Sequence, residues 1–439
     1  MADPQAQALN PAARERIYRR NFVFFLIDNI LFSVALSIIS STTVIPDFVR
    51  RLTDSEILIG LSGSLFMIGF TLPQLFIARY IVRYARKKWW FVGPNIPVRF
   101  VILIFAGIAV LLGRDRLELV LLAFFICYSI AAFGDGLVGV PWADLAGTSL
   151  DNRWRARMFG FTSAITGVLM LLVAPLIGSV LGDPDLPFPT NYAVLFGASG
   201  VLFAISILPG LFFHELPGGK AVEKLPSFAE FLPQMGRLLR DDVPFRAFIV
   251  LRIFTSLFMM ALPFYVGFAT VELGLSSDVA VPVLLAMQTI GTVAGALAYT
   301  WLGARSNLLY MRLALISAML LPISALLAGV LGPLPLYVGF LVSGLSASGN
   351  LMSSYLNWVV GYASPDQRPI YVGLSNTVSA VVAFIAPIIG GVIAQYFGYH
   401  PLFVGSLLMA LGALVVTVRF LRETPAEAAP EVAVDSIPA

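Results

Sequence analysis

Residues 174–178 read Ala-Pro-Leu-Ile-Gly and residues 386–390 read Ala-Pro-Ile-Ile-Gly, each inside a long apolar stretch. The two copies are 212 residues apart. A second pattern, Ser-acid followed by Ile-Gly, recurs at an offset of 222 residues: Ser55-Glu56 with Ile68-Gly69, and Ser277-Asp278 with Ile290-Gly291. Two matches at nearly the same spacing indicate that the chain consists of two related halves.

The composition predicts a membrane protein. Of the 439 residues, 58% are hydrophobic and only 12% are charged, and the mean hydropathy is +0.88. A soluble protein with so few charges could not cover its surface. Apolar runs of about 20 residues each fit membrane-spanning helices: 21–45, 57–80, 91–112, 117–141, 157–181, 192–213, 244–270, 279–302, 308–330, 334–360, 369–397 and 401–420. Because lipid offers no hydrogen-bond partners to the backbone, we expect an all-α polytopic protein with twelve transmembrane helices.

The distribution of basic residues predicts the orientation. With both termini in the cytoplasm, 22 of the 28 Lys and Arg residues lie on the cytoplasmic side. Four lie outside (Arg50, Arg51, Arg114 and Arg116), and Arg99 and Arg252 lie within helices. This is the asymmetry that the positive-inside rule requires. We therefore expect a multi-pass protein of the cell (plasma or inner) membrane, with its net charge of +3 reflecting orientation rather than nucleic-acid binding.

The helices divide into two pseudo-symmetric six-helix bundles. We expect a cytoplasmic N-terminal tail (1–20), an N-terminal bundle (21–213), a cytoplasmic linker (214–243), a C-terminal bundle (244–421) and a disordered cytoplasmic tail (422–439). Within the linker, apolar residues between Ser227 and Leu239 recur at helical spacing, which is typical of an amphipathic helix lying on the membrane face. A passive linker and a regulatory docking site both fit this segment.

Twelve helices, a six-plus-six repeat and a long central loop resemble the major facilitator superfamily, and the resemblance spans essentially the whole chain. In that family the loop between the second and third helices reads Gly-x-x-x-Asp-Arg-x-Gly-Arg-Arg; residues 78–87 here match its basic positions, with Ala for both glycines and Val82 for the aspartate. The resemblance implies a secondary transporter that works by alternating access.

Two local matches point to different subfamilies. Residues 140–145 (Val-Pro-Trp-Ala-Asp-Leu), followed by Asp151-Asn-Arg153, resemble the loop after the fourth helix in glycoside–pentoside–hexuronide cation symporters. Those symporters tend to carry acidic residues in their second helix, where this chain has only Gln74, so sodium-coupled sugar symport is not supported. Residues 174–179 resemble the end of the Gly-Pro-x-x-Gly-Gly motif of antiporters.

Four ionisable residues are expected inside the membrane: Asp28, Arg99, Asp135 and Arg252. Each costs roughly 2.5–3.5 kcal/mol at a helix centre, so each needs a partner or a hydrated cavity. Asp28 and Arg252 lie at similar depth in the first and seventh helices, which are repeat-equivalent. We therefore expect a pair that forms in one conformation only, so that Asp28 loads and releases a proton. A static ion pair, or an Asp28 carboxyl group hydrogen-bonded to Asn29 and Ser33, remains an alternative.

The other two charges suggest a second pair. Asp135 lies between Gly134 and Gly136, and Arg99 is expected at similar depth in the neighbouring helix. A structural salt bridge and a proton site are both open for Asp135. Arg99 could instead extend to the lipid headgroups, and Arg252 could bind an anionic substrate directly, because its guanidinium fits a carboxylate or phosphate.

Uncharged and hinge residues complete the candidate list. The candidate cavity hydrogen-bonding groups, each also explicable as helix–helix contacts, are Gln74, Tyr265, Gln288, Asn350 and Asn357. Gate or hinge candidates are Asp144, Arg153, Pro175, Arg368 and Pro387. The segment from Asn357-Trp358 to Arg368 repeats the pattern of Trp142 to Arg153, which favours a gating role for both.

No enzyme signature is present. The chain has two histidines and one cysteine, and it lacks a P-loop, so neither a His-rich metal site nor ATP-driven transport is expected. We predict a monomeric secondary carrier without a cofactor that moves a small molecule, with the proton as coupling ion and membrane lipids as surroundings. A lipid, amphiphile or drug exporter and a non-transporting membrane sensor are the alternatives.

Overall fold

The computed structural model describes residues 11–81, 84, 86–216, 236, 238–302, 306–346, 348–364 and 367–421. Among the sequence-based expectations, the amphipathic segment 227–239 falls almost entirely, and the C-terminal tail 422–439 wholly, outside these residues. The side chain of Asn350 is also outside the description.

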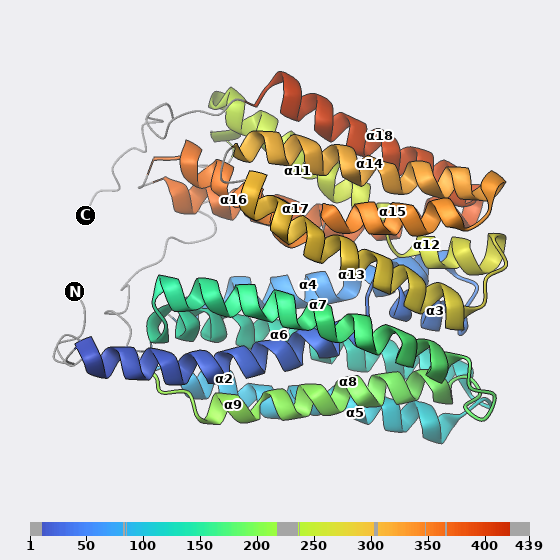
Figure 1. Cartoon of the computed structure of the whole chain (residues 1–439), viewed down its shortest axis with the longest axis horizontal. Helices are drawn as coiled ribbons and strands as arrows, with labels where there is room; N and C mark the ends of the chain where they lie inside the picture. Colours follow the sequence, from blue (N-terminus) through green and yellow to red (C-terminus); the bar gives the residue numbers. More distant parts are fainter. Residues whose placement is uncertain are drawn as a thin grey trace. The chain divides into compact units, whose positions relative to one another are not determined.

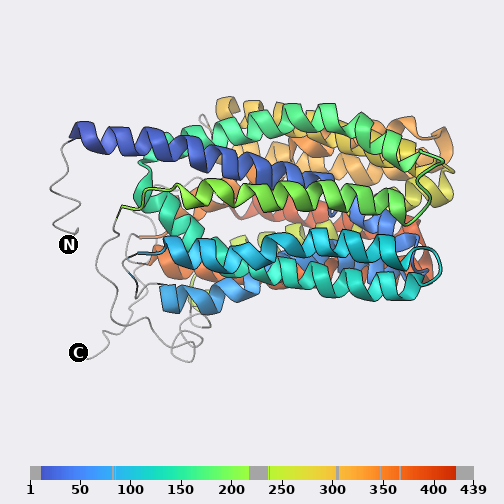
Figure 2. The ribbon, with the colours of Figure 1, turned by 90° about the horizontal axis from the view of Figure 1, so that it is seen from below.

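The first half of the chain forms eight described helices. They are α2 (Pro11–Ile38), α3 (Val44–Arg50), α4 (Glu56–Ile81), α5 (Lys88–Leu112), α6 (Leu117–Ser149), α7 (Asn152–Leu181), α8 (Thr190–Ser206) and α9 (Leu208–Leu211). In Figure 1 α5 and α8 lie side by side, and in Figure 2 α5 and α6 do so, in agreement with their contacts.

The second half continues with ten helical segments. They are α11 (Val243–Phe258), the 3₁₀ segment η1 (Met259–Ala261), α12 (Phe264–Gly267), the π-helical η2 (Phe268–Glu272), α13 (Ser277–Leu302), α14 (Asn307–Leu331), α15 (Leu334–Leu345), α16 (Ser348–Tyr362), α17 (Arg368–Phe397) and α18 (Tyr399–Arg419).

Eleven stretches of the described chain are long and apolar enough to cross a membrane. The expected all-helical membrane fold is therefore confirmed. The tenth expected run, 334–360, corresponds to α15 and α16, and α15 by itself is only 12 residues long. The seventh run is interrupted at η1, just before Pro263, because proline has no N–H to continue the helical hydrogen bonds.

Two helix boundaries differ from the expectation. Residues 140–145, expected in a loop, lie within α6, which continues to Ser149. The helix passes Pro141 because Leu145 and Ala146 join a buried cluster with Phe25 and Phe91. At the N-terminus, the described part of α2 already includes residues from Pro11 onward, ten residues ahead of the expected apolar run.

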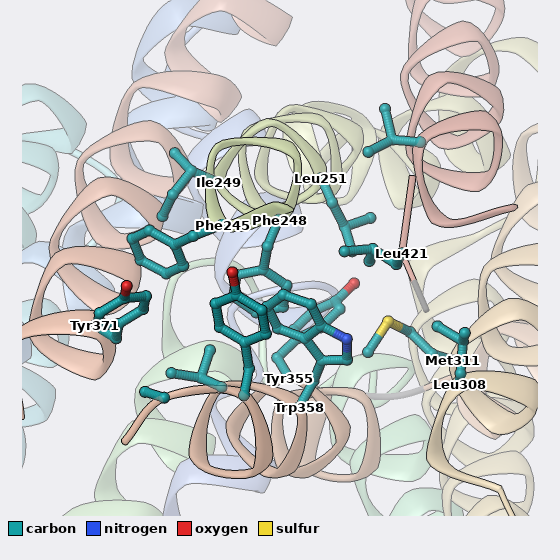
Figure 3. Close-up of a cluster of buried hydrophobic side chains, with 14 of the residues drawn as sticks. Phe245, Phe248, Ile249, Leu251, Leu308, Met311, Tyr355, Trp358, Tyr371 and Leu421 are labelled. Carbon is teal, nitrogen blue, oxygen red and sulfur yellow. The ribbon is translucent and has the colours of Figure 1, made fainter. Parts of the chain in front are cut away.

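The chain divides into two compact units whose boundaries differ from the sequence halves. Unit 1 comprises residues 1–225, 262–289 and 387–396, and unit 2 comprises residues 226–261, 290–386 and 397–439. The core of unit 2 contains Phe245 and Phe248 of α11 packed with Tyr355 and Trp358 of α16 (Figure 3).

Within unit 1, the repeated sequence patterns contact one another. A Cβ on Gly178 of α7 would lie 2.9 Å from the carbonyl oxygen of Asp278. Correspondingly, a Cβ on Gly391, next to the second Ala-Pro-Ile-Ile-Gly copy in α17, would lie 2.5 Å from the carbonyl oxygen of Glu56. Each helix that carries the Ala-Pro motif thus packs on the helix start that carries the Ser-acid motif, at a distance that only glycine permits.

Candidate coupling site

Two of the four predicted intramembrane charges form an ion pair in unit 1. Arg99 of α5 places Nη1 3.1 Å from Oδ1 of Asp135 of α6, and both side chains are buried. Of the arrangements expected for Arg99, the structure has the pair with Asp135 rather than an extension toward headgroups. The guanidinium also lies 4.5 Å from the ring centroid of Phe32 and 5.3 Å from that of Phe203, which adds cation–π attraction in a buried site.

Gly136, beside Asp135, allows α6 to approach α4 closely. A Cβ at Gly136 would lie 2.5 Å from the carbonyl oxygen of Phe70. Small residues at such positions let two helix backbones come together in the membrane. Asp135 is therefore carried on a segment that is fixed on both sides, by α4 and by Arg99 of α5.

Asp28 is the third member of the cluster. It is 3% exposed, and its Oδ2 accepts a hydrogen bond of 2.9 Å from the indole N–H of Trp142 in α6. Its Oδ1 is buried without a hydrogen-bond partner among the described residues. Arg99 and Asp135 both act on Asp28 electrostatically, the first by attraction and the second by repulsion.

The cluster therefore contains two carboxyl groups and one guanidinium. When both carboxyl groups are ionised it carries an excess negative charge in a buried site, which is costly. A single proton on either carboxyl group removes this excess. A small cavity of about 10 Å³, lined by Arg99, Asp135 and Tyr128 among others, adjoins the pair; this is close to the space that one water molecule needs.

Arg252 lies in unit 2. It is 3% exposed in α11, and its guanidinium carbon lies 4.6 Å from the ring centroid of Tyr355, a residue of the cluster in Figure 3. The expected alternating pair of Asp28 with Arg252 joins residues of different units and stays a prediction.

The uncharged candidates are dispersed. Gln288 of α13 accepts a hydrogen bond of 3.4 Å from Thr42, Tyr265 is fully buried in α12, and Gln74 of α4 faces Gly139 of α6. Asn357 of α16 is exposed. These four therefore lie on α4, α12, α13 and α16, whereas the Asp28 cluster is built from α2, α5 and α6.

The gate candidates fall near helix ends or within helices. Asp144 forms an ion pair with Lys87, at the start of α5; Lys87 thus supplies a charge pairing between the loop after α4 and a neighbouring helix. Arg368 donates from Nε to the carbonyl oxygen of Ala363 at 3.2 Å, and Arg153 is exposed. Pro175 and Pro387 lie inside α7 and α17.

Sequence reasoning missed two buried acids. Asp47 of α3 accepts a hydrogen bond from Tyr192 of α8. Asp242 accepts from the hydroxyl groups of Tyr362 and Tyr371, at 2.7 Å each, and caps α11 through the N–H of Phe245. The signal for Asp242 was available, since Asp followed by Val-Pro is a typical helix start; the two tyrosines could not be found in this way.

This arrangement of long apolar helices defines a polytopic membrane protein. The model of the Major Facilitator Superfamily matches residues 25–387 and 312–439, and the chain belongs to this family of membrane transporters. No curated protein sequence matches the chain.

Solved structures agree in fold. A point mutant of the nucleoside transporter NupG aligns with a TM-score of 0.67 at 15% identity, covering 91% of this chain and 98% of that chain. A bacterial homologue of the iron transporter ferroportin, in its inward-facing state, aligns with a TM-score of 0.66 at 14% identity, covering 91% of this chain and 98% of that chain. A D-xylose–proton symporter aligns with a TM-score of 0.66 at 14% identity, covering 92% of this chain and 98% of that chain. At these identities the likeness establishes the fold alone.

Proposed function

We propose that this secondary transporter is proton-coupled and that the Asp28–Arg99–Asp135 cluster holds the transported proton. The observation that carries the proposal is the charge imbalance. Two buried carboxyl groups interact with one buried guanidinium, Asp135 by direct pairing and Asp28 through its charge, and Asp28 has an oxygen without a hydrogen-bond partner among the described residues. Ionisable groups inside a membrane protein mark ion pathways by default.

The residues have distinct roles in this proposal. Asp135 stays paired with Arg99. Asp28 accepts a hydrogen bond only from the Trp142 N–H among the described residues, and it gains and loses the proton. Protonation of Asp28 removes its repulsion of Asp135, and deprotonation restores a negative charge that competes for Arg99. Because the two carboxyl groups repel each other, protonation of one favours ionisation of the other.

Proton binding can be measured before the substrate is known. Infrared difference spectra between acidic and neutral pH should contain a carboxyl C=O band in the wild-type protein that is lost in Asp28→Asn. Asp115→Asn, in an exposed turn, is the matched control and should retain the band. A wild-type protein without any titrating buried carboxyl band, or an unchanged band in Asp28→Asn, would reject the proposal.

Transport supplies the second test. A thermal-shift screen against sugars, nucleosides, amino acids, organic anions, cationic drugs and lysolipids identifies a ligand, since a solute at about 100 times its dissociation constant adds roughly 2.7 kcal/mol of stability. In liposomes, Asp28→Asn should abolish accumulation driven by a pH gradient while exchange of the solute across the membrane continues. Accumulation by Asp28→Asn at the wild-type rate contradicts the assignment.

We also propose that both termini face the cytoplasm, on the basis of the basic residues. The only native cysteine, Cys127, is buried, so single cysteines introduced at Arg16 and Asp115 report the side on which each lies. A membrane-impermeant maleimide added to intact cells should label position 115 and leave position 16 unlabelled. The reverse pattern would invert the topology.

A further inference from the structure

Unit 2 contains a polar cleft that the proposed transport mechanism does not use. It lies where α14 begins and α18 ends, two helices that pack side by side (Figure 1). Its volume is about 470 Å³, which is within the range of small-molecule sites. The walls are formed by Ser306, Leu308, Leu309, Arg312, Val418, Arg419 and Leu421.

Among the described residues, the charged groups that line the cleft are of one sign. Two of these wall residues are arginines, and none is acidic. Arg419 is exposed in the last turn of α18. Arg312 donates from Nη2 to the carbonyl oxygen of Thr417 at 3.4 Å, and its buried Nε has no acceptor among the described residues. Two guanidinium groups on one cleft favour an anion with several oxygens, which they can bind in a bidentate manner.

The ends of two helices also meet at the cleft. Ser306 caps α14 by accepting a 3.0 Å hydrogen bond from the N–H of Leu309, so the positive end of this 25-residue helix lies there. The 21-residue helix α18 ends at the same cleft with its negative end. The two helix dipoles therefore oppose each other, and the preference for an anion comes from the two arginines.

The surroundings of the cleft are apolar. From Leu309, a row of exposed residues continues along α14 at helical spacing, through Leu313, Ile316 and Leu320. From Val418, a second row runs along α18, through Val415, Leu411 and Leu408. An anion-binding cleft from which two apolar stripes extend along membrane-spanning helices has the shape of a phospholipid, with its phosphate at the helix ends and its acyl chains along the stripes.

We propose that this cleft binds the headgroup phosphate of an anionic phospholipid through Arg312 and Arg419. A free phosphate would use the arginines but gain nothing from the two apolar stripes. The site is separate from the proton site, so failure of either proposal leaves the other standing.

The test uses the full-length protein purified in detergent and stripped of lipid. Phosphatidylglycerol, phosphatidylcholine and inorganic phosphate are each added, and binding is followed by native mass spectrometry and thermal shift. Phosphatidylglycerol should bind and raise the melting temperature more than phosphatidylcholine, and inorganic phosphate at the same concentration should do neither.

Two double variants locate the site. Arg312→Gln with Arg419→Gln should weaken phosphatidylglycerol binding about tenfold or more, as expected for the loss of charged hydrogen bonds. Arg16→Gln with Arg19→Gln removes the same charge from α2 and should bind as the wild type does. Equal binding of phosphatidylglycerol and phosphatidylcholine, full binding by the Arg312/Arg419 variant, or equal stabilisation by inorganic phosphate would each overturn the proposal. Melting temperature without lipid shows whether the variant is folded.

Discussion

Gly391 of α17 lies directly against the backbone of Glu56 at the start of α4, with no room for a side chain between them. In the first half Gly178, one position earlier in its copy of the repeat, has the same relation to Asp278. Both contacts join one copy of the Ala-Pro repeat to one copy of the Ser-acid repeat. The duplication visible in the sequence is therefore also a duplication of helix-packing contacts within unit 1.

The close packing at Gly391 predicts that even a methyl side chain at this position destabilises the protein. Gly391→Ala places a methyl group 2.5 Å from a backbone carbonyl oxygen, so one helix must shift, at a cost of about 1–3 kcal/mol. Gly373→Ala lies in the same helix with nothing within 4 Å and should be neutral or slightly stabilising. Thermal melting of both variants in detergent decides the point; equal melting temperatures would contradict close packing at Gly391.

The buried ion pair predicts strong coupling between Arg99 and Asp135. Arg99→Gln should destabilise the protein by about 3–5 kcal/mol, because it leaves the buried Asp135 carboxylate without its partner. Asp135→Asn should cost less, because Asp28 still supplies a negative charge that attracts Arg99. The double variant should lose less than the sum of the single losses. A double-mutant cycle of melting temperatures measures this, with Arg19→Gln, which breaks the exposed pair with Glu15, as control. If the double variant loses as much stability as the two single variants together, Arg99 and Asp135 do not act as a pair.

The Trp142–Asp28 hydrogen bond predicts a specific role for the indole N–H. Trp142→Phe keeps an aromatic ring but removes the N–H donor. It should lower the free energy of unfolding by about 1.5–3 kcal/mol, the contribution of a hydrogen bond to a charged group. Trp154→Phe loses a longer bond of 3.4 Å to Glu15 and should cost less. In an Asp28→Ala background the effect of Trp142→Phe should shrink, and its persistence there would assign the loss to packing alone.

Substitution of Asp242 should destabilise the protein more than the loss of an ordinary helix cap does. Asp242→Ala removes the cap of α11 and leaves the hydroxyl groups of Tyr362 and Tyr371 without their acceptor. The cap alone is worth about 1 kcal/mol, and each buried donor left unpaired adds about 1–3 kcal/mol. Asp151→Ala removes only the cap of α7, where Asp151 accepts from Trp154. Similar melting temperatures for the two variants would mean that the tyrosines contribute nothing.

The sequence by itself determined the class of the protein. The all-helical membrane class follows from apolar runs of about 20 residues, because the bilayer imposes length and composition on each segment separately. The two related halves follow from the repeated Ala-Pro and Ser-acid patterns. The partnership of Arg99 with Asp135 was also accessible, since both were expected at similar depth in neighbouring helices. Helix ends were less accessible: α6 continues past Pro141 because Leu145 and Ala146 are buried against other helices.

Only the tertiary structure decided which side chains meet across helices. Trp142 and Asp28 are 114 residues apart, and Asp242 is 129 residues from Tyr371. A helix fixes the spacing of its own side chains, but its rotation relative to its neighbours comes from packing over the whole unit. Arg312 and Arg419, the two arginines of the proposed lipid site, are 107 positions apart in the sequence, near the start of α14 and at the end of α18. They line one cleft only because these two helices pack together.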